Sequence, residues 1–486
     1  MKLPVSRRVF LQAAAMMPLA ACTTQNPPAP PGQTPQPQNP PTPPANPPGP
    51  VTRSEVRSAA GLAMLAKYAK AVAIMKDTTA NPVGSPVSWQ FQWFIHWTPS
   101  DKNALITQIY PGGNPANWKS VADKTWATCQ AHFASFSREW FFLSWHRRYV
   151  LSLEAIVRKV LQDQTFALPY WDYSSNQVLP DQFRMPNDPT FKSLFHDPRG
   201  PGINDGDPID SAEAIQQLQH DALCQTRYIG TSPANPGFCD HIDFNLHGTV
   251  HGAIGGDMGS VPTAAQDPIF WLHHCNIDRL WASWIAAGGK NPTDSAFLNE
   301  PFTFADPNGN AFDTTSGSVL DPAALGYSYD RLETRPADCP PFAARETAGP
   351  PVVTHQGSGP VTLGATPTVL ALRATGAAAR EAAGAHTWLI ISGVSAPSSP
   401  GTVYQVSVSL PASANAADRE PKRVGTINFF DVVPHEGHAA RTDKAFAFDV
   451  TGIVKAGANP SVTIAPRRAP GGNAQVTVGS VQLVRR

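Results

Sequence analysis

The chain of 486 residues carries 37 basic and 37 acidic side chains, so its formal net charge is zero. Hydrophobic residues make up 42% and charged residues 15%, which is typical of a globular protein long enough for two or three domains. No cluster of Lys and Arg follows a helix or loop, so we expect no nucleic-acid partner.

Residues 1–22 have the features of a targeting segment. The stretch SRRVFL (residues 6–11) resembles a twin-arginine export signal, and the apolar run after it is too short to span a bilayer permanently. The run ends in LAAC (residues 19–22), which resembles a bacterial lipobox, although ordinary signal-peptide cleavage would also fit. We therefore expect export to the bacterial cell envelope, with the membrane contacted only through a lipid anchor at Cys22.

Residues 23–50 form the next expected unit, a Pro-rich disordered linker. Within it, residues 27–50 contain 13 prolines and no charged side chain. Such a segment cannot bury a core, so we expect an extended spacer.

Residues 51–335 are predicted to form a mainly α-helical domain, because four stretches carry apolar residues at helical spacing. These stretches suggest a bundle with a site in its middle. Asp267-Pro268 is a favourable helix start, and Asp243 or Asn245 is the expected N-cap of the preceding helix. The expected helices are residues 55–75, 141–162, 243–254 and 267–287.

The pattern changes after about residue 340 to short runs of alternating apolar and polar residues, separated by Pro, Gly and Asn turns. Residues 386–486 are therefore expected to form an all-β sandwich or barrel, joined to the helical domain by a linker over residues 336–385. Export also permits disulfides. Cys224 and Cys239 flank a loop rich in Pro, Gly and Ser and are the expected pair, whereas Cys275 is expected to be a small core residue.

Histidines concentrate in the last two expected helices. His247 and His251 are four residues apart, so a helix presents both rings on one side. A zinc hydrolase uses the same spacing, but it requires Glu directly after the first His, where this chain has Gly248. Further histidines in apolar surroundings complete two groups of three, and three imidazoles suit copper as well as zinc. The groups are His96, His132 and His146, and His247, His251 and His274.

Four further motifs carry a resemblance to a known family. FLSWHRRYVLSLE (residues 142–154) and DPIFWLHHCNID (residues 267–278) are similar to the two copper signatures of the tyrosinase, catechol oxidase and polyphenol oxidase family, which also includes molluscan haemocyanin. LPYWDYS (residues 168–174) and YSY (residues 327–329) are similar to other landmarks of the family. The likeness spans roughly residues 62–331.

The resemblance implies two copper ions, Cu A held by the first group of histidines and Cu B by the second, with His273 next to the ligand His274. His132 departs from the family pattern, because it lies 14 residues before His146, whereas the usual position is Ser137 here. Cys129 would be linked to His132 by a thioether, or be free or in a disulfide. Asp278 would orient an imidazole or pair with an arginine.

The implied activity is oxidation of o-diphenols to o-quinones, with O2 as co-substrate and a small phenol as partner; an o-aminophenol oxidase and a haemocyanin-like O2-binding protein are the alternatives. Monophenol hydroxylation is expected to be weak, because members that hydroxylate often have Asn after the first Cu B histidine and this chain has Gly248. Asp243 is either the acidic partner of that chemistry or an N-cap. Val261, 13 residues before His274, is a gate residue or simply packs in a loop.

The β domain resembles the C-terminal domain of plant polyphenol oxidases, which shields the copper site in the proenzymes. The same role is expected here, or else a permanent structural or adhesive one.

Overall fold

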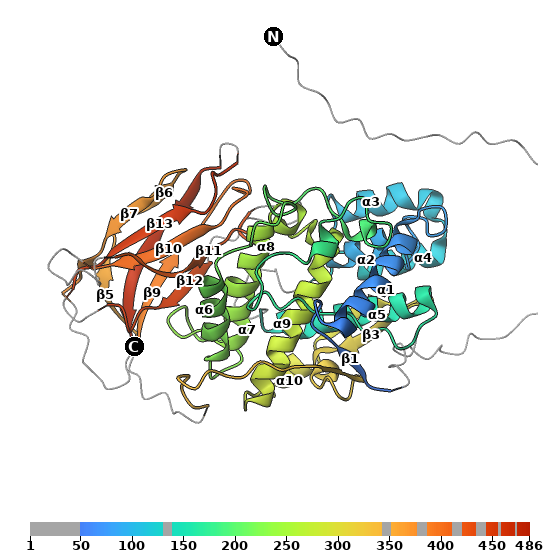
Figure 1. Cartoon of the computed structure of the whole chain (residues 1–486), viewed down its shortest axis with the longest axis horizontal. Coiled ribbons are helices and arrows are strands. Elements are labelled where there is room, and N and C mark those ends of the chain that lie inside the picture. Colours follow the sequence, from blue (N-terminus) through green and yellow to red (C-terminus); the bar gives the residue numbers. More distant parts are fainter. Residues whose placement is uncertain are drawn as a thin grey trace, which may run out of the picture. The chain divides into compact units, whose positions relative to one another are not determined.

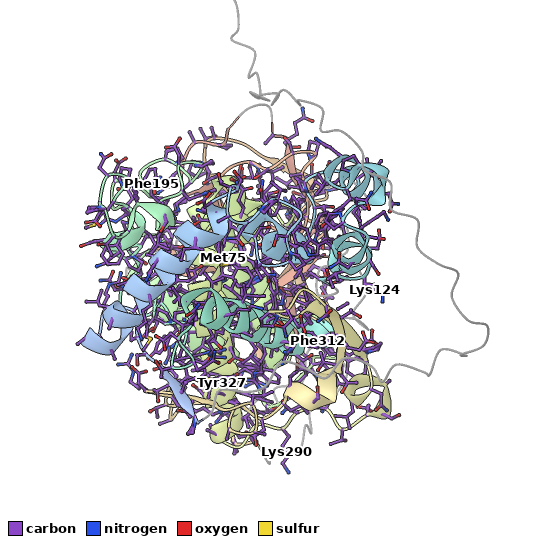
Figure 2. All side chains as sticks on the ribbon, turned by 90° about the vertical axis from the view of Figure 1, so that its right-hand side faces the viewer. Met75, Lys124, Phe195, Lys290, Phe312 and Tyr327 are labelled. Atoms are coloured by element: carbon purple, nitrogen blue, oxygen red, sulfur yellow. A yellow bond between two sulfur atoms is a disulfide. The ribbon has the colours of Figure 1, made fainter. Side chains whose placement is uncertain are left out.

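The computed structural model describes residues 49–129, 139–342, 351–376, 386–410, 420–433, 444–454, 458–471 and 474–486. Helices occupy the blue to yellow part of the chain and a β-sandwich occupies the orange and red part (Figure 1), which confirms the expected fold class. Side chains fill the space between the helices, and Met75 and Tyr327 are two of the buried ones (Figure 2). Within this described part, no helix combines the length and the apolar character that a membrane span requires.

The predicted helix around residues 141–162 is α5, and its end has a clear local cause. Gln162 adopts the left-handed conformation, with φ of 54°, and its backbone N–H donates to the Lys159 carbonyl at 3.2 Å. At the start of α9, the Asp267 carboxylate accepts from the Ile269 N–H at 3.1 Å, as the Asp-Pro motif predicted. The helices are α1 (Ala59–Lys76), α2 (Trp89–His96), α3 (Lys102–Ile109), α4 (Ala116–Thr125), α5 (Phe142–Leu161), α6 (Ala212–Leu223), α7 (Phe238–His241), α8 (Gly248–Ile254), α9 (Ile269–Ala286) and α10 (Ser295–Leu298).

The third predicted helix starts earlier than expected. It begins with α7, capped by Gly237, and continues through a π-helical segment, Ile242–His247, into α8. Asp243 and Asn245 therefore lie inside the helix, and the N-cap interpretation of either residue is wrong. The start could not be located from the sequence, because a π-helical turn shifts the spacing of apolar residues away from that of an α-helix.

A buried ionic network joins the two ends of the helical domain, where β1 (Val51–Arg53) pairs in parallel with β4 (Tyr327–Tyr329). The Arg53 guanidinium donates to Glu154 at 2.9 and 3.0 Å and to Asp278 at 3.0 Å. Arg147 donates to the other oxygen of Asp278, so Asp278 pairs with arginines and not with an imidazole. Burial favours a raised pKa for Asp278, but Arg147, Arg53 and the hydroxyls of β4 reverse this and lower the pKa below its usual value.

The β domain contains a four-stranded sheet in the order β11-β10-β13-β7 and a five-stranded sheet in the order β12-β9-β15-β5-β8. Alternate side chains of the strands, such as Leu389, Ile391 and Val406, form the hydrophobic core of this domain. The strands are β5 (Val352–Gln356), β6 (Val361–Leu363), β7 (Thr368–Ala371), β8 (Arg373–Ala374), β9 (Thr387–Ser392), β10 (Tyr404–Ser409), β11 (Lys422–Ile427), β12 (Ala445–Asp449), β13 (Ser461–Pro466), β14 (Val476–Val478) and β15 (Ser480–Arg485); β2 (Pro301–Ala305) and β3 (Ala311–Thr315) form a hairpin in the first domain.

The sandwich begins inside the stretch that the sequence assigned to a linker. β5 pairs with β15, about 130 residues further along the chain, and β7 pairs with β13, about 90 residues further along. β5 and β7 are only five and four residues long and lack strong alternation. Their stability comes from distant partners, which a local pattern does not report.

The predicted Cys224–Cys239 disulfide is wrong. Cys224, at the end of α6, is bonded to Cys339, 115 residues later, with the Cα atoms 4.7 Å apart. Cys239 lies buried in α7 instead. Nearness in the sequence favoured the first pairing, but the fold brings Cys339 within disulfide distance of Cys224.

His220, in the last turn of α6, links this helix to the segment that contains Cys339. Its ring nitrogens lie 3.2 Å from Asp221 and 3.1 Å from Asp338. The hydrogen bond to Asp221, opposed by partial burial and assisted by Asp338, raises the pKa of His220 to about 9.

This raised pKa predicts a pH-dependent contribution to stability. The contribution is fully present below the unfolded histidine pKa of 6.5 and is lost as the pH rises through about 9. The difference in urea midpoint between the wild type and His220→Gln should therefore shrink between these two pH values. A difference that stays constant or grows would contradict the assignment.

Candidate metal centre

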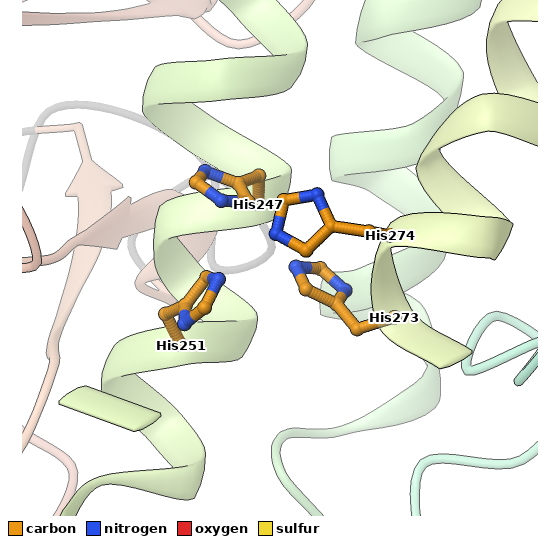
Figure 3. A group of neighbouring side chains, drawn as sticks. All are labelled: His247, His251, His273 and His274. Atoms are coloured by element: carbon orange, nitrogen blue, oxygen red, sulfur yellow. The ribbon is translucent and has the colours of Figure 1, made fainter. Parts of the chain in front are cut away.

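Five of the six histidines chosen from the sequence lie around one buried space. His247 and His251 project from the π-helical segment and α8, opposite His273 and His274 of α9 (Figure 3). The ring centroids of His247 and His274 are 5.2 Å apart, and those of His251 and His274 are 5.8 Å apart. His96 at the end of α2 and His146 on α5 form the other side, with centroids 5.7 Å apart.

The rings on both sides are held by backbone carbonyls through Nδ1. His96 Nδ1 lies 3.1 Å from the Val261 carbonyl, and His146 Nδ1 lies 2.8 Å from the Phe142 carbonyl. His251 Nδ1 lies 2.7 Å from the Met258 carbonyl. Such a bond places the proton on Nδ1 and leaves the lone pair of Nε2 for a metal ion.

Burial keeps three of these imidazoles neutral. It lowers the pKa of His146, His251 and His274 well below 6.5, and the neighbouring imidazoles lower it further. Among the described residues, Nε2 of His251 and both ring nitrogens of His274 are buried without a hydrogen-bond partner, which is costly unless another group satisfies them. Neutral, buried and unsatisfied imidazoles are a donor set that fits a transition-metal ion such as copper.

The group around His96 also contains a thiol. Candidate donor atoms of His96, Cys129 and His146 lie within 4.8 Å of one another, and Cys129 Sγ is 3.7 Å from His146 Nε2. His132 lies outside the described residues, so its place in this group and its thioether to Cys129 stay predictions. Cys275 packs in the core against the Leu168 carbonyl, as expected.

The adjacent histidines of α9, His273 and His274, make different ring contacts. His274 stacks on His146 with centroids 4.2 Å apart, so it faces the other histidine group. His273 stacks on His247, with centroids 5.4 Å apart, and its ring is 5.5 Å from Tyr173. All four histidines in Figure 3 have donor atoms within 4.8 Å of one another, and of the adjacent pair it is His274 that stacks on His146 of the other group.

Phenylalanines that the sequence analysis did not single out form walls of this space. Phe270 lies 4.2 Å from His274 and 5.1 Å from His96, measured between ring centroids. Phe142 lies 4.7 Å from both His146 and His247. Both occur inside the two quoted copper-type motifs, next to the histidines at helical spacing, and that spacing was the available signal.

The two residues proposed to act beside the metals have defined positions. The Asp243 carboxylate lies 3.1 Å from His247 Nδ1, so Asp243 contacts a predicted ligand. Val261 is buried, and its carbonyl holds His96; whether its side chain acts as a gate stays a prediction.

A side chain of the β domain covers the site. The Phe430 ring stacks on His251 with centroids 3.9 Å apart and a 19° angle between planes, and it meets His247 edge-on at 5.3 Å. Phe430 and Val403 belong to the same hydrophobic core as the helical domain. The sequence indicated a shielding domain but not which residue enters the site, because Phe430 follows β11 in an ordinary apolar run.

Comparison with known proteins agrees with this geometry. Residues 86–203 and 196–287 match the common central domain of tyrosinase, and residues 291–341 match the polyphenol oxidase middle domain. A tyrosinase from Hahella sp. (strain CCB-MM4) is 32% identical over 54% of this chain and 60% of its own length. Polyphenol oxidase A of Solanum lycopersicum is 28% identical over 56% of this chain and 45% of its own length. The matches thus span only about half the length of these relatives.

Solved structures share the fold over most of the chain. Latent apple tyrosinase superposes with a TM-score of 0.60 at 20% identity, covering 91% of this chain and 98% of that one. A functional unit of octopus hemocyanin superposes with a TM-score of 0.51 at 18% identity, covering 88% and 99%.

A helical core that carries two facing groups of buried histidines defines the class of type-3 copper proteins. Within that class, the matched domains are decisive. The chain belongs to the tyrosinase and polyphenol oxidase family, whose members are dicopper enzymes.

Proposed function

We propose that the protein is an exported copper oxidase that converts o-diphenols to o-quinones. The observation that supports this most is the convergence of five buried imidazoles, four of which have Nδ1 near a backbone carbonyl. Bound in the two groups, a pair of copper ions would supply the exchange of two electrons with each diphenol and the reduction of O2. Two diphenols release four electrons and four protons, and one O2 takes them up to form two water molecules.

The chain's own residues position these ions and the substrate. His96 and His146, with His132 as the predicted third ligand, would hold Cu A, and His247, His251 and His274 would hold Cu B. Phe142 and Phe270 surround the imidazoles with apolar surface, which excludes water and suits a flat aromatic ring. Asp243 fixes the orientation of His247.

Monophenol hydroxylation is proposed to be weak or absent. The position directly after His247 is Gly248, which offers no side-chain amide to polarise a water molecule. One carboxylate oxygen of Asp243 lies 3.1 Å from His247 Nδ1, so Asp243 orients this ring. A phenol panel separates the alternatives: catechol should be oxidised faster than tyrosine, and o-aminophenol tests the related oxidase. Reversible O2 binding without catechol oxidation would favour the haemocyanin-like alternative.

We also propose that the β domain keeps the enzyme latent. Phe430 lies flat on His251 and occupies the space in which a substrate ring would approach Cu B. Export and lipid anchoring at Cys22 are proposed from residues 1–22 alone, which lie outside the described part of the chain.

Activity and latency are tested together in the copper-loaded full-length chain. We expect slow uptake of O2 with catechol and a rate at least about tenfold higher in Phe430→Ala, because removal of the ring lets substrate reach His251. Val369→Ala, an exposed substitution on the same domain, is the control and should leave the rate unchanged. No O2 uptake by either protein would reject the oxidase, and equal rates would reject latency alone.

A further inference from the structure

One face of α8 lacks side chains where the β domain meets it. Gly248 and Gly252 are four residues apart, so they lie on the same face. A Cβ on Gly248 would come within 2.5 Å of Asn428 Oδ1 and 2.8 Å of its Cγ. A Cβ on Gly252 would come within 2.9 Å of Val403 Cγ1. The two glycines therefore form a groove, here called the glycine groove, that Asn428 and Val403 fill.

Asn428 is held in the glycine groove from both sides. It is fully buried, and its Nδ2 donates to the Phe244 carbonyl of the π-helical segment at 2.7 Å. Its Oδ1 accepts from Lys444 Nζ at 3.1 Å, and Lys444 is itself buried and paired with Asp431. The Asn428 amide therefore cannot swing aside when an added methyl group presses on it.

The groove lies directly beside the histidines. Gly248 follows His247, and Gly252 follows His251. On the other side of the groove, Asn428 lies two residues before Phe430, whose ring covers His251. Two glycines within a seven-residue helix weaken that helix relative to alanine, so a packing role gives them a physical reason.

We propose that Asn428, seated in the glycine groove, is the positioning residue that holds Phe430 over His251. This inference rests on the proposed latency and names the contact that maintains it. It also explains Gly248: because the Asn428 amide occupies the space above this position, no side chain fits there in the covered form. The chain therefore has no polar side chain directly after His247, and the contact of Asn428 with α8 keeps Phe430 in place over His251.

The contact can be tested from both of its sides in the full-length chain. Gly248→Ala fills the groove, and Asn428→Ala removes the amide while the sequence of the helical domain stays unchanged. The first readout is the rate at which diethyl pyrocarbonate modifies His251 in the metal-free protein, with exposed His386 as internal reference. The second is catechol oxidation by the copper-loaded protein. We expect both rates to rise about tenfold in each variant. Both substitutions break the same contact, so the two rates in the double variant should be similar to those in the single variants.

Gly259→Ala is the matched control, because a Cβ there would meet only the His251 carbonyl, at an ordinary 3.9 Å. Wild-type labelling of His251 in both Gly248→Ala and Asn428→Ala would overturn the proposed contact, even if Phe430→Ala activates the enzyme. Faster labelling without faster catechol oxidation would support the contact and reject latency.

Discussion

Replacing His251 with alanine should remove one of two copper ions per chain and lower catechol oxidation more than about 100-fold. His251 is fully buried, its Nδ1 is held by Met258, and its Nε2 has no partner within the described residues. Without this lone pair, only two of the three predicted Cu B ligands, His247 and His274, would remain. Copper analysis of the purified protein and O2 uptake in the Phe430→Ala background, where the site is uncovered, measure both effects.

The adjacent histidines of α9 provide a sharper control for the same site. His274→Ala should behave like His251→Ala, because His274 lies between the two groups of imidazoles. His273→Ala should retain both ions, because it is His274 that stacks on His146, whereas the ring of His273 lies beside Tyr173. If His273→Ala loses copper and His274→Ala does not, the ligand assignment on α9 is reversed.

Asp278→Asn should be the most destabilising conservative substitution in the helical domain. Asp278 is 3% exposed and accepts hydrogen bonds from Arg53, Arg147, Tyr327 and Tyr329. Among the described residues, neutralising Asp278 leaves the buried guanidinium of Arg53 paired with Glu154 and that of Arg147 without a paired carboxylate. We expect a loss of about 3–5 kcal/mol in the free energy of unfolding, measured by urea denaturation.

A surface ion pair serves as the comparison. Asp123 and Lys119 are partly exposed and lie four residues apart on α4, with 2.8 Å between Oδ2 and Nζ. Asp123→Asn should cost less than about 1 kcal/mol. If Asp278→Asn costs no more than that, the buried network does not hold the domain ends together.

The sequence supported the helices best where the apolar spacing was long and uninterrupted. It predicted α5 and α9 nearly to their ends, because Asp267-Pro268 and the run after Phe141 act locally. It also identified five histidines that the structure gathers, since H-x3-H and the copper-type motifs are local patterns. The same reasoning failed at Asp243, where a π turn inserts an extra residue into the helix.

Contacts between residues far apart in the chain could not be predicted from local sequence patterns. The Cys224–Cys339 bond joins residues 115 apart, and β5 is a strand only because β15 returns to pair with it. Nothing around Phe430 or Asn428 distinguishes them from other residues at the end of a strand. Their importance depends on what α8 places opposite them.

The amino-acid sequence by itself determined the class of side chains at the centre and the helices that carry them, because helical periodicity and imidazole chemistry are properties of short segments. Tertiary structure alone decided which histidine of α9 faces the other group, which cysteines bond and which ring covers the site. Those outcomes depend on distances between residues far apart in the chain, and such distances are set by packing of the whole core.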